Sequence, residues 1–512
     1  MDLLLINPGN ASGIYQDLSR NLAAIEPPTW ALLLAEAARA KGYAVGILDV
    51  NAERLDAEEA TERIISAEAK INCFVVYGQN VNSGTVAMSG ACALADALKS
   101  KNRNSLVVFV GSYVQALPKK ALIDEPSIDI VLTNEGVYSL LNLLRLDRYD
   151  IDTLKEIKGI CFRAENNSIF LTDPEIVVPS TRLDEDLPGY AWDLLPFEDT
   201  PLDLYRSPLW HAEYNEKLRT PYAAIQTSLG CNFGCSFCMI NIINRSDNDE
   251  IGVASNYKGM RFWSVGHTLN QFDKLAELGV RTIRVVDEMF LLYRKHYEPL
   301  CYSLSKRPYA DELRMWAYSR VDTVTNPEVL KLVRSAGFKW LCLGIESATK
   351  SVRLEVSKGK FEDVDIAGVI SQVHQAGIEV LANYIVGLPG ETQESMRRTL
   401  DFSKELCTSG WNMYTAMALP GSELYRNAVE ENIELPKTYT GFSWHSKDSF
   451  PMPTKTLSSA EIVAFRDLAF IEYHTDPQFV SRIRKRFGEG ALETIRKMTD
   501  VKLDRDLLSN KS

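Results

Sequence analysis

Short apolar runs alternate with helix-period segments over the first 145 residues. Five apolar runs predict strands at Asp2–Asn7, Ala44–Val50, Cys73–Tyr77, Leu106–Val110 and Ile128–Leu132. Between them, apolar residues three and four positions apart predict helices of roughly 10–15 residues, among them Pro28–Lys41 and Thr85–Ser100. This alternation predicts a Rossmann-like, doubly wound parallel sheet, and ligands bind outside the carboxyl ends of the strands in such sheets.

The same alternation returns after residue 217 and continues to residue 425. Six further strands are predicted at Tyr222–Ser228, Val280–Val286, Met315–Tyr318, Trp340–Ile345, Glu379–Val386 and Asn412–Ala418. Six strand–helix units predict a partial parallel barrel that works at the carboxyl ends of its strands. We therefore expect an α/β protein.

Two other regions complete the predicted organisation. Residues 146–217 read as a connector with short strands at Lys158–Arg163 and Ser168–Thr172. Residues 426–512 are a mostly helical C-terminal region, with helices at Ser459–His474 and Pro477–Phe487. The expected units are therefore 1–145, 146–217, 218–425 and 426–512.

Composition narrows the classes of partner. The 512 residues carry a net charge of −12, and no basic stripe is available to neutralise phosphates, so we expect no nucleic-acid partner. No apolar run reaches the roughly 18–20 residues of a membrane span. Nine cysteines, an odd number found mostly inside apolar runs, favour a reducing cytoplasm over a disulfide framework.

Three of the cysteines form a C-x3-C-x2-C run at Cys231, Cys235 and Cys238. Three thiolates on one loop can hold an iron–sulfur cluster and leave one iron open to a ligand that is not protein. A structural zinc site is the rival interpretation, but it needs four ligands, usually in pairs. A chance trio of buried thiols is the third. The remaining cysteines are scattered singly, at Cys73, Cys92, Cys161, Cys301, Cys342 and Cys407.

This spacing, with aromatic Phe237 before the last cysteine, resembles the motif of the radical S-adenosylmethionine (SAM) superfamily. The resemblance implies that Cys231, Cys235 and Cys238 bind a [4Fe–4S] cluster. In that family the open iron chelates SAM, and the reduced cluster cleaves SAM to a 5′-deoxyadenosyl radical. Phe237 is then expected beside SAM.

Polar residues end the predicted barrel strands, as a SAM site requires. Arg320 can bind the SAM carboxylate bidentately. Carboxylates can accept from its ammonium and ribose groups, and Tyr384–Leu388 can hold its adenine through backbone groups and an apolar slot. The full expected set is Phe237, Asp287, Glu288, Arg320, Glu346, Ser347, Tyr384, Val386, Gly387, Leu388 and Pro420. The alternative for Arg320 and Glu346 is a structural ion pair across the barrel mouth.

The N-terminal region resembles the cobalamin-binding domain that precedes many radical SAM cores. The resemblance rests on Asn7-Pro8, Pro27-Pro28, Asp49 and the Asn134-Glu135-Gly136 turn. By position, Gln79, Asn80 and Val81 would approach the lower face of cobalamin, and Gly111, Ser112 and Tyr113 its nucleotide tail. The D-x-H-x-x-G motif is absent and no histidine precedes His211, so no imidazole of this domain is expected on cobalt.

These features predict a cobalamin-dependent radical SAM enzyme that methylates an unactivated carbon of a small molecule of natural-product type. Radical cyclisation, ring contraction or rearrangement on the same scaffold stays open, with cobalamin used differently or not bound. A cluster that serves only electron transfer or sensing is a further alternative. A reductant such as flavodoxin or ferredoxin is expected, and Trp444 and His445 are candidates to face the substrate pocket.

Overall fold

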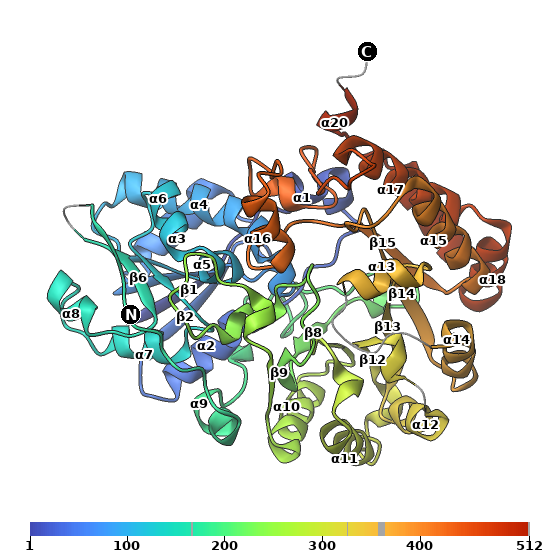
Figure 1. The fold of residues 1–512 in the computed structure, drawn as a ribbon. Coiled ribbons are helices and arrows are strands. Elements are labelled where there is room, and N and C mark those ends of the chain that lie inside the picture. Colours follow the sequence, from blue (N-terminus) through green and yellow to red (C-terminus); the bar gives the residue numbers. More distant parts are fainter. Residues whose placement is uncertain (165–166, 325, 357–363, 510–512) are drawn as a thin grey trace.

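Two sheets lie side by side in the computed structural model, each covered by helices (Figure 1). The structure describes residues 1–164, 167–324, 326–356 and 364–509. It confirms the predicted α/β class, with one largely parallel and one wholly parallel sheet and a helical C-terminal region.

The first sheet has seven strands in the order β2-β1-β3-β4-β5-β6-β7. The strands are β1 (Leu3–Asn7), β2 (Val45–Asp49), β3 (Ile71–Val75), β4 (Val107–Val110), β5 (Ile130–Leu132), β6 (Ile160–Arg163) and β7 (Ile169–Leu171). The first five are parallel, whereas β6 and β7 add to the edge as antiparallel strands. Part of the predicted connector is therefore an extension of this sheet, because its two short strands pair with β5 and with each other.

Helices cover both faces of the first sheet, as its fully buried strands β3 and β4 require. In Figure 1, α3 and α4 lie above the sheet and α2 and α7 below it. The helices of this region are α1 (Ala11–Tyr15), α2 (Thr29–Arg39), α3 (Ala57–Ser66), α4 (Gly84–Lys101), α5 (Ser112–Ala116), α6 (Pro118–Asp124), α7 (Val137–Leu144), α8 (Ile151–Lys155) and α9 (Leu183–Asp186).

The second sheet is a six-stranded, wholly parallel partial barrel in the order β15-β14-β13-β12-β11-β8. Its strands are β8 (Tyr222–Ile225), β11 (Thr282–Val285), β12 (Arg314–Arg320), β13 (Phe338–Glu346), β14 (Glu379–Val386) and β15 (Gly410–Thr415). The helices along the barrel segment are α10 (Val265–Glu277), α11 (Arg294–Leu304), α12 (Pro327–Ser335), α13 (Lys350–Val356), α14 (Ile366–Gln375), α15 (Gln393–Leu406) and α16 (Glu423–Glu430).

The predicted first barrel strand, Tyr222–Ser228, is interrupted. β8 ends at Ile225, and Ser228–Cys231 forms a separate strand, β9, which pairs antiparallel with β10 (Gly259–Phe262). The chain leaves the barrel between the two because Asp287 accepts hydrogen bonds from the Thr227 backbone N–H at 2.6 Å and the Ser228 hydroxyl at 2.7 Å. This hairpin carries the cysteine run away from the barrel wall.

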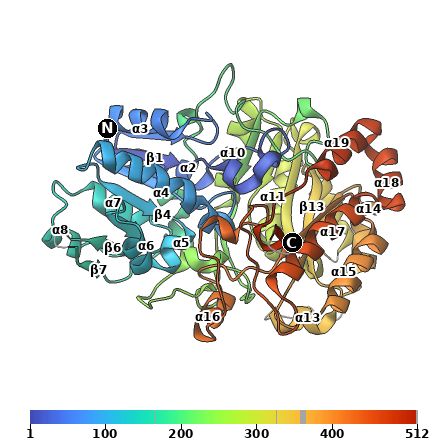
Figure 2. The same cartoon turned by 90° about the horizontal axis from the view of Figure 1, so that it is seen from above.

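The C-terminal helices run along the barrel on the side away from the first sheet (Figure 2). They are α17 (Ser459–His474), α18 (Pro477–Phe487), α19 (Glu489–Asp500) and α20 (Asp506–Ser509), and the first two match the predicted bounds. Phe487 of α18 stacks on Trp340 at 5.8 Å, and Trp210 of the connector packs edge-on against the same ring at 5.1 Å. These side chains close the amino end of the barrel. Within the described ranges, every helix is too short or too polar to span a lipid bilayer.

Residues before α2 reach into the barrel itself. Glu26 forms an ion pair with Arg284 of β11, and their side chains are only 6% and 2% exposed. The Arg284 guanidinium lies over the Trp316 ring, 4.7 Å from its centre. Arg219, just before β8, donates to the carbonyls of Asn21 and Ala23 at 3.1 Å each. The two sheets therefore share one continuous interior.

Candidate active site

The cysteine run lies at the carboxyl ends of the barrel strands, between the barrel and the first sheet (Figure 1). Gly230 enters the run with φ +81°, and a Cβ there would lie 2.2 Å from the carbonyl oxygen of Gly259. The Asn241 side chain accepts from the Cys231 N–H at 2.7 Å and donates to the Phe233 carbonyl at 3.2 Å. Contacts within the protein therefore hold the cysteine loop in place.

The thiols of this loop are near one another. Burial raises the pKa of Cys231 to about 12 and that of Cys238 well above its ordinary value, and the charge of Cys235 contributes to both shifts. The Phe233 N–H donates to the Cys231 sulfur at 3.4 Å, a contact that favours a thiolate. Because metal ligands must be deprotonated, cluster assembly here would release protons.

Across the part of the chain that the structure describes, no three His, Cys, Asp or Glu side chains are already gathered around one point as metal ligands. The cysteine side chains would therefore have to turn toward a common centre as a cluster assembled. The donor set fits an iron–sulfur cluster nonetheless, because one anchored loop supplies three cysteine sulfurs.

Asp287 has a different task from the predicted contact with SAM. Its carboxylate accepts from the Thr227 N–H and hydroxyl, both at 2.6 Å, and from the Ser228 hydroxyl. His296 contacts the Thr227 hydroxyl at 3.0 Å. These bonds take up most of the acceptor capacity of Asp287. We infer that Asp287 positions the hairpin that carries the cysteines.

Two other carboxylates at strand ends remain available. Glu288 follows β11 and Glu346 ends β13, and no hydrogen bond joins either side chain to the described residues. Burial raises the pKa of Glu288 to about 8 and that of Glu346 to about 7, with Arg320 opposing the second shift. Glu346 also has φ +65°, in the left-handed region that residues other than glycine rarely occupy. Unpartnered, strained groups of this kind are typical of ligand sites.

Arg320 lies between the barrel and the cysteine loop. Its guanidinium binds the Asp322 carboxylate through Nε at 2.6 Å and Nη2 at 2.5 Å. Its Cζ lies 3.8 Å from the centre of the Phe233 ring. The guanidinium is therefore fixed against the loop by an ion pair and a cation–π contact, with its charge held at the barrel mouth.

Successive side chains of β14 point to opposite faces of the sheet, so the residues predicted to surround adenine do not all face the same side. Tyr384 and Val386 lie in the core between sheet and helices, so only their backbone could line a ligand. Ile385 points to the opposite face and belongs to an apolar cluster at the barrel mouth. Its buried members are Val352, Val356, Ile385, Leu388 and Ala416, with Phe237 packed against them. Ile385 falls inside the predicted slot Tyr384–Leu388 but was not singled out as a SAM-binding residue, although the two-residue period of a strand could have identified it.

Three of the other residues predicted to bind SAM serve local structure. Gly387 has φ +80°, and a Cβ there would meet Ile462 of α17 at 2.8 Å, so a helix rather than a ligand requires the glycine. The Ser347 hydroxyl lies 3.2 Å from that of Thr399. Pro420 is buried in the turn between β15 and α16.

Several polar groups predicted to contact cobalamin are taken up by the protein. Asn7 donates to Asp49 at 2.8 Å. Glu135 forms a two-pronged ion pair with Arg261 of β10, at 3.0 and 2.6 Å, and also accepts from the Val178 N–H at 2.6 Å. Asn134 donates to the Glu175 carbonyl at 2.7 Å. The predicted Asn134-Glu135-Gly136 site is therefore an interdomain contact.

Other residues at the same edge fit a ligand better. The hydroxyls of Ser112 and Thr85 are buried and have no hydrogen-bond partner among the described residues. Gly111 follows β4 and Gly84 begins α4. Both are so closely packed that a Cβ would lie 2.3 Å from the Val76 oxygen at Gly111 and 2.0 Å from the Ser112 hydroxyl at Gly84. The two hydroxyls without a partner among the described residues are therefore the groups at this edge that a ligand could engage by hydrogen bonds.

The other residues predicted to contact cobalamin lie along the same carboxyl edge of the first sheet. Gln79, Asn80 and Pro8 are partly exposed, Val81 is buried, and the Tyr113 ring packs edge-on against Tyr439 at 5.1 Å.

The predicted pocket residues of the C-terminal region lie beside the last barrel strand. Trp444 donates to the Thr415 carbonyl at the end of β15 at 2.9 Å, and the His445 ring lies 5.5 Å from that of Tyr15.

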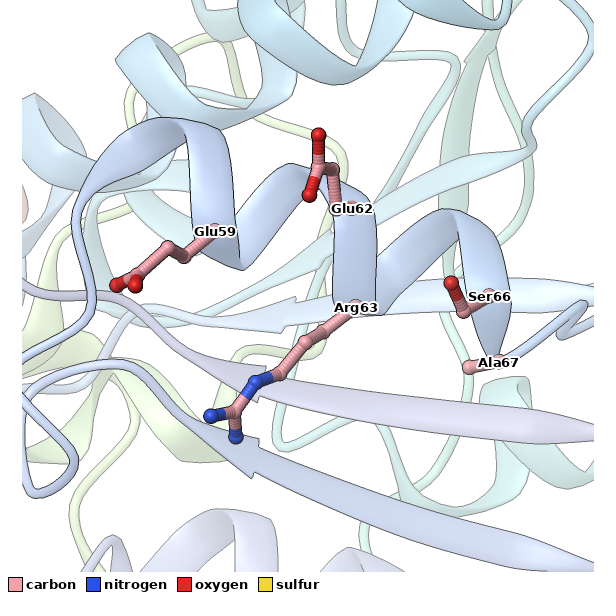
Figure 3. A pocket seen from close by; sticks show the side chains of 5 residues that line it. All are labelled: Glu59, Glu62, Arg63, Ser66 and Ala67. Atoms are coloured by element: carbon pink, nitrogen blue, oxygen red, sulfur yellow. The ribbon is translucent and has the colours of Figure 1, made fainter.

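A surface hollow of about 480 Å³ lies elsewhere, along α3 (Figure 3). It is lined by Glu59, Glu62, Arg63, Ser66 and Ala67. This lining offers only short and charged side chains along one helix, and none of the predicted site residues is among them.

A loop of three cysteines above a six-stranded partial barrel, joined to a doubly wound sheet, defines a class of metalloenzymes that bind a cluster and a nucleotide-like ligand at one edge. Residues 225–403 match the sequence model of the radical SAM superfamily. This part of the chain is a radical SAM domain.

Comparison with whole proteins supports this placement. An uncharacterized methyltransferase of Pyrococcus horikoshii is 26% identical and aligns over 93% of both chains. The anaerobic magnesium-protoporphyrin IX monomethyl ester cyclase of Cereibacter sphaeroides is 24% identical over 81% of this chain and 62% of its own. The radical SAM methyltransferase TsrM of Kitasatospora setae, solved with cobalamin and a [4Fe–4S] cluster, has 16% identity and a TM-score of 0.65, covering 97% of this chain and all of that one. The fold is thus shared across both sheets.

Proposed function

We propose that this protein is a cobalamin-dependent radical SAM methyltransferase that acts on an unactivated carbon of a small molecule. One observation carries the proposal: the three-cysteine loop contacts Asn82 at the carboxyl edge of the first sheet, and the hydroxyls of Thr85 and Ser112 at that edge have no hydrogen-bond partner among the described residues. The methyltransferase named among its relatives, and the TsrM structure solved with cobalamin and a cluster, support it.

The position of each residue indicates which ligand it would bind. Cys231, Cys235 and Cys238 would hold a [4Fe–4S] cluster. Glu288 and Glu346 would accept from the ammonium and ribose of SAM, because no hydrogen bond from the described residues occupies either carboxylate and the positive charges that act on them are those of Arg284 and Arg320. When bound, the cluster would supply reductive cleavage of SAM, and cobalamin a methyl group for transfer.

The surrounding residues would position and shield these ligands. The apolar cluster around Ile385 and Leu388 would exclude water and offer a slot for adenine. Arg320 would present positive charge to the SAM carboxylate from its fixed place on Phe233. Ser112 and Thr85 would hydrogen-bond the nucleotide tail of cobalamin. A flavodoxin- or ferredoxin-like reductant would deliver the electron.

A second function, radical cyclisation or rearrangement, is favoured by one specific finding. The Cereibacter sphaeroides relative is named as a cyclase, and its alignment covers 81% of this chain. The cluster, SAM and cobalamin sites described above would serve that reaction equally well. Product analysis therefore separates the two functions, whereas cofactor content does not.

The test is anaerobic reconstitution with iron, sulfide and hydroxocobalamin, followed by desalting and an optical spectrum. We expect one [4Fe–4S] cluster, bound cobalamin and SAM cleavage under a strong reductant. The triple variant of Cys231, Cys235 and Cys238 to Ala should lose the cluster and SAM cleavage, whereas the control Cys407→Ala, outside the loop, should keep both. A cubane signal in the triple variant, or no cobalamin in the wild type, would contradict the proposal.

The cobalt environment is a further part of the proposal. Residues 1–210 contain no histidine, so we expect no protein imidazole from the first domain on cobalt. Electron paramagnetic resonance of the cob(II)alamin form reports nitrogen splitting directly. Splitting from a protein imidazole would show that this part is wrong.

A further inference from the structure

Asn82 is the point at which the first sheet contacts a predicted cluster ligand. It lies in a 3-10 turn, Val81–Ser83, between β3 and α4. Its Oδ1 accepts from the Met239 N–H at 3.0 Å, and its Nδ2 and Oδ1 each lie 3.9 Å from the Cys238 sulfur, as donor to the sulfur and as acceptor from the thiol. Because the Met239 N–H fixes which end of the amide is oxygen, the Nδ2 hydrogens remain for the sulfur.

The turn that presents Asn82 is rigid. The Ser83 N–H donates to the Asn80 carbonyl at 3.0 Å, and the Ser83 hydroxyl accepts from the Asn80 N–H at 3.2 Å. Gly84, which begins α4, is so tightly packed that a Cβ would lie 2.0 Å from the Ser112 hydroxyl. Asn82 therefore cannot move away from Cys238 without moving the edge of the first sheet.

We propose that Asn82 is a positioning residue that tunes the reduction potential of the cluster through Cys238. An amide donor aimed at a ligand sulfur stabilises the extra negative charge of the reduced cluster, and such bonds are among the determinants of cluster potential. The electron comes from the external reductant, and no bond forms or breaks at Asn82. The inference rests on the proposed function, since it needs a cluster on Cys238.

The position of Asn82 also links the predicted cluster site to the predicted cobalamin site. Gln79 and Asn80 directly precede its turn and Val81 begins it, and these are the residues expected below cobalamin. A ligand that shifts the edge of the first sheet would carry this turn with it and move the amide relative to the Cys238 sulfur. The potential of the cluster should therefore respond to occupancy of the first domain, and it should lose that response when the amide is removed.

The decisive variant is Asn82→Asp, because a carboxylate can still accept from the Met239 N–H but cannot donate to sulfur. Asn80→Asp adds the same charge to the same turn without the contact to Cys238, and it serves as the matched control. Each reconstituted protein is titrated with reductant and followed by electron paramagnetic resonance. Iron content and thermal unfolding of the metal-free proteins are measured in parallel.

We expect Asn82→Asp to keep its iron and its unfolding temperature and to become reduced only at a lower potential than the wild type, with a much smaller shift for Asn80→Asp. Adding hydroxocobalamin should shift the potential of the wild type and not that of Asn82→Asp. Equal potentials in wild type and Asn82→Asp, or an equal shift in the control, would overturn the inference while leaving the proposed function intact. Absence of a cluster in the wild type would instead overturn both.

Discussion

Glu346 provides a test in which stability and ligand binding should move in opposite directions. Burial raises its pKa from 4.5 to about 7, although nearby Arg320 opposes the shift. At 1.36 kcal/mol per pKa unit this corresponds to about 3 kcal/mol, and partial exposure of the side chain reduces it to about 1–2 kcal/mol. A buried, unpartnered carboxylate should therefore destabilise the folded protein when it is ionised.

The sign of the pH dependence follows from the raised pKa. Below pH 4.5 the carboxyl is protonated in both the folded and unfolded states, so Glu346→Gln should match the wild type. Between pH 4.5 and 7 the unfolded state ionises first, and the wild type loses stability relative to the variant. At pH 8 we expect Glu346→Gln to have the higher free energy of unfolding, by about 1–2 kcal/mol.

Ligand binding should change in the other direction. If Glu346 accepts a charge-assisted hydrogen bond from SAM, its loss costs about 1.5–3 kcal/mol, or roughly ten- to a hundredfold in affinity. Denaturant unfolding of the metal-free protein at pH 4.5 and 8, and SAM binding to the reconstituted protein, measure the two effects. Glu405→Gln, exposed on α15, is the control and should change stability by less than about 0.5 kcal/mol. A variant that binds SAM normally and is less stable at pH 8 would show that Glu346 is a structural partner of Arg320.

Three further outcomes follow from contacts of the described residues. Arg261→Met should lower the free energy of unfolding by about 3–5 kcal/mol in urea, since it leaves Glu135 buried and unpaired; an additional Glu135→Gln change should recover part of the loss, and no recovery would contradict the ion pair. Ser112→Ala should weaken binding in an optical titration with hydroxocobalamin without lowering stability, because its hydroxyl has no protein partner; unchanged affinity would place the nucleotide tail elsewhere. Gly387→Ala should lower the unfolding temperature, because its φ is +80° and the new Cβ meets Ile462, and Ile462→Ala in the same chain should relieve part of the clash.

The elements that sequence predicted best are those set by local periodicity. β14 and the helices α17 and α18 have the predicted bounds, because alternation and helix caps are local signals. β9 was missed as a separate strand, since its departure from the barrel depends on Asp287, about 60 residues further along the chain. The pairing of β6 and β7 with the first sheet was missed for the same reason.

In the candidate site, too, features set by sequence spacing could be predicted, whereas features that depend on contacts between distant residues could not. Spacing alone indicated the cysteine run, and the strand ends placed Glu346 and Arg320 near it. Which carboxylates are free could not be predicted, because Glu135 and Asp287 are occupied by partners from other domains and strands. Asn82 has no sequence signal of its own, since its contact with the cysteine loop exists only once the two sheets dock.

The ion pair between Glu26 and Arg284 has a consequence for how such an enzyme can be divided or recombined. Each domain holds one half of a charge pair that is almost fully buried in the other's presence. A barrel expressed alone would carry an uncompensated arginine among Trp316 and Tyr318, and a first domain exchanged with that of a relative would succeed only if it brought a matching acid. The two domains look like separate modules, but a change at Glu26 or Arg284 in one domain requires a matching change in the other.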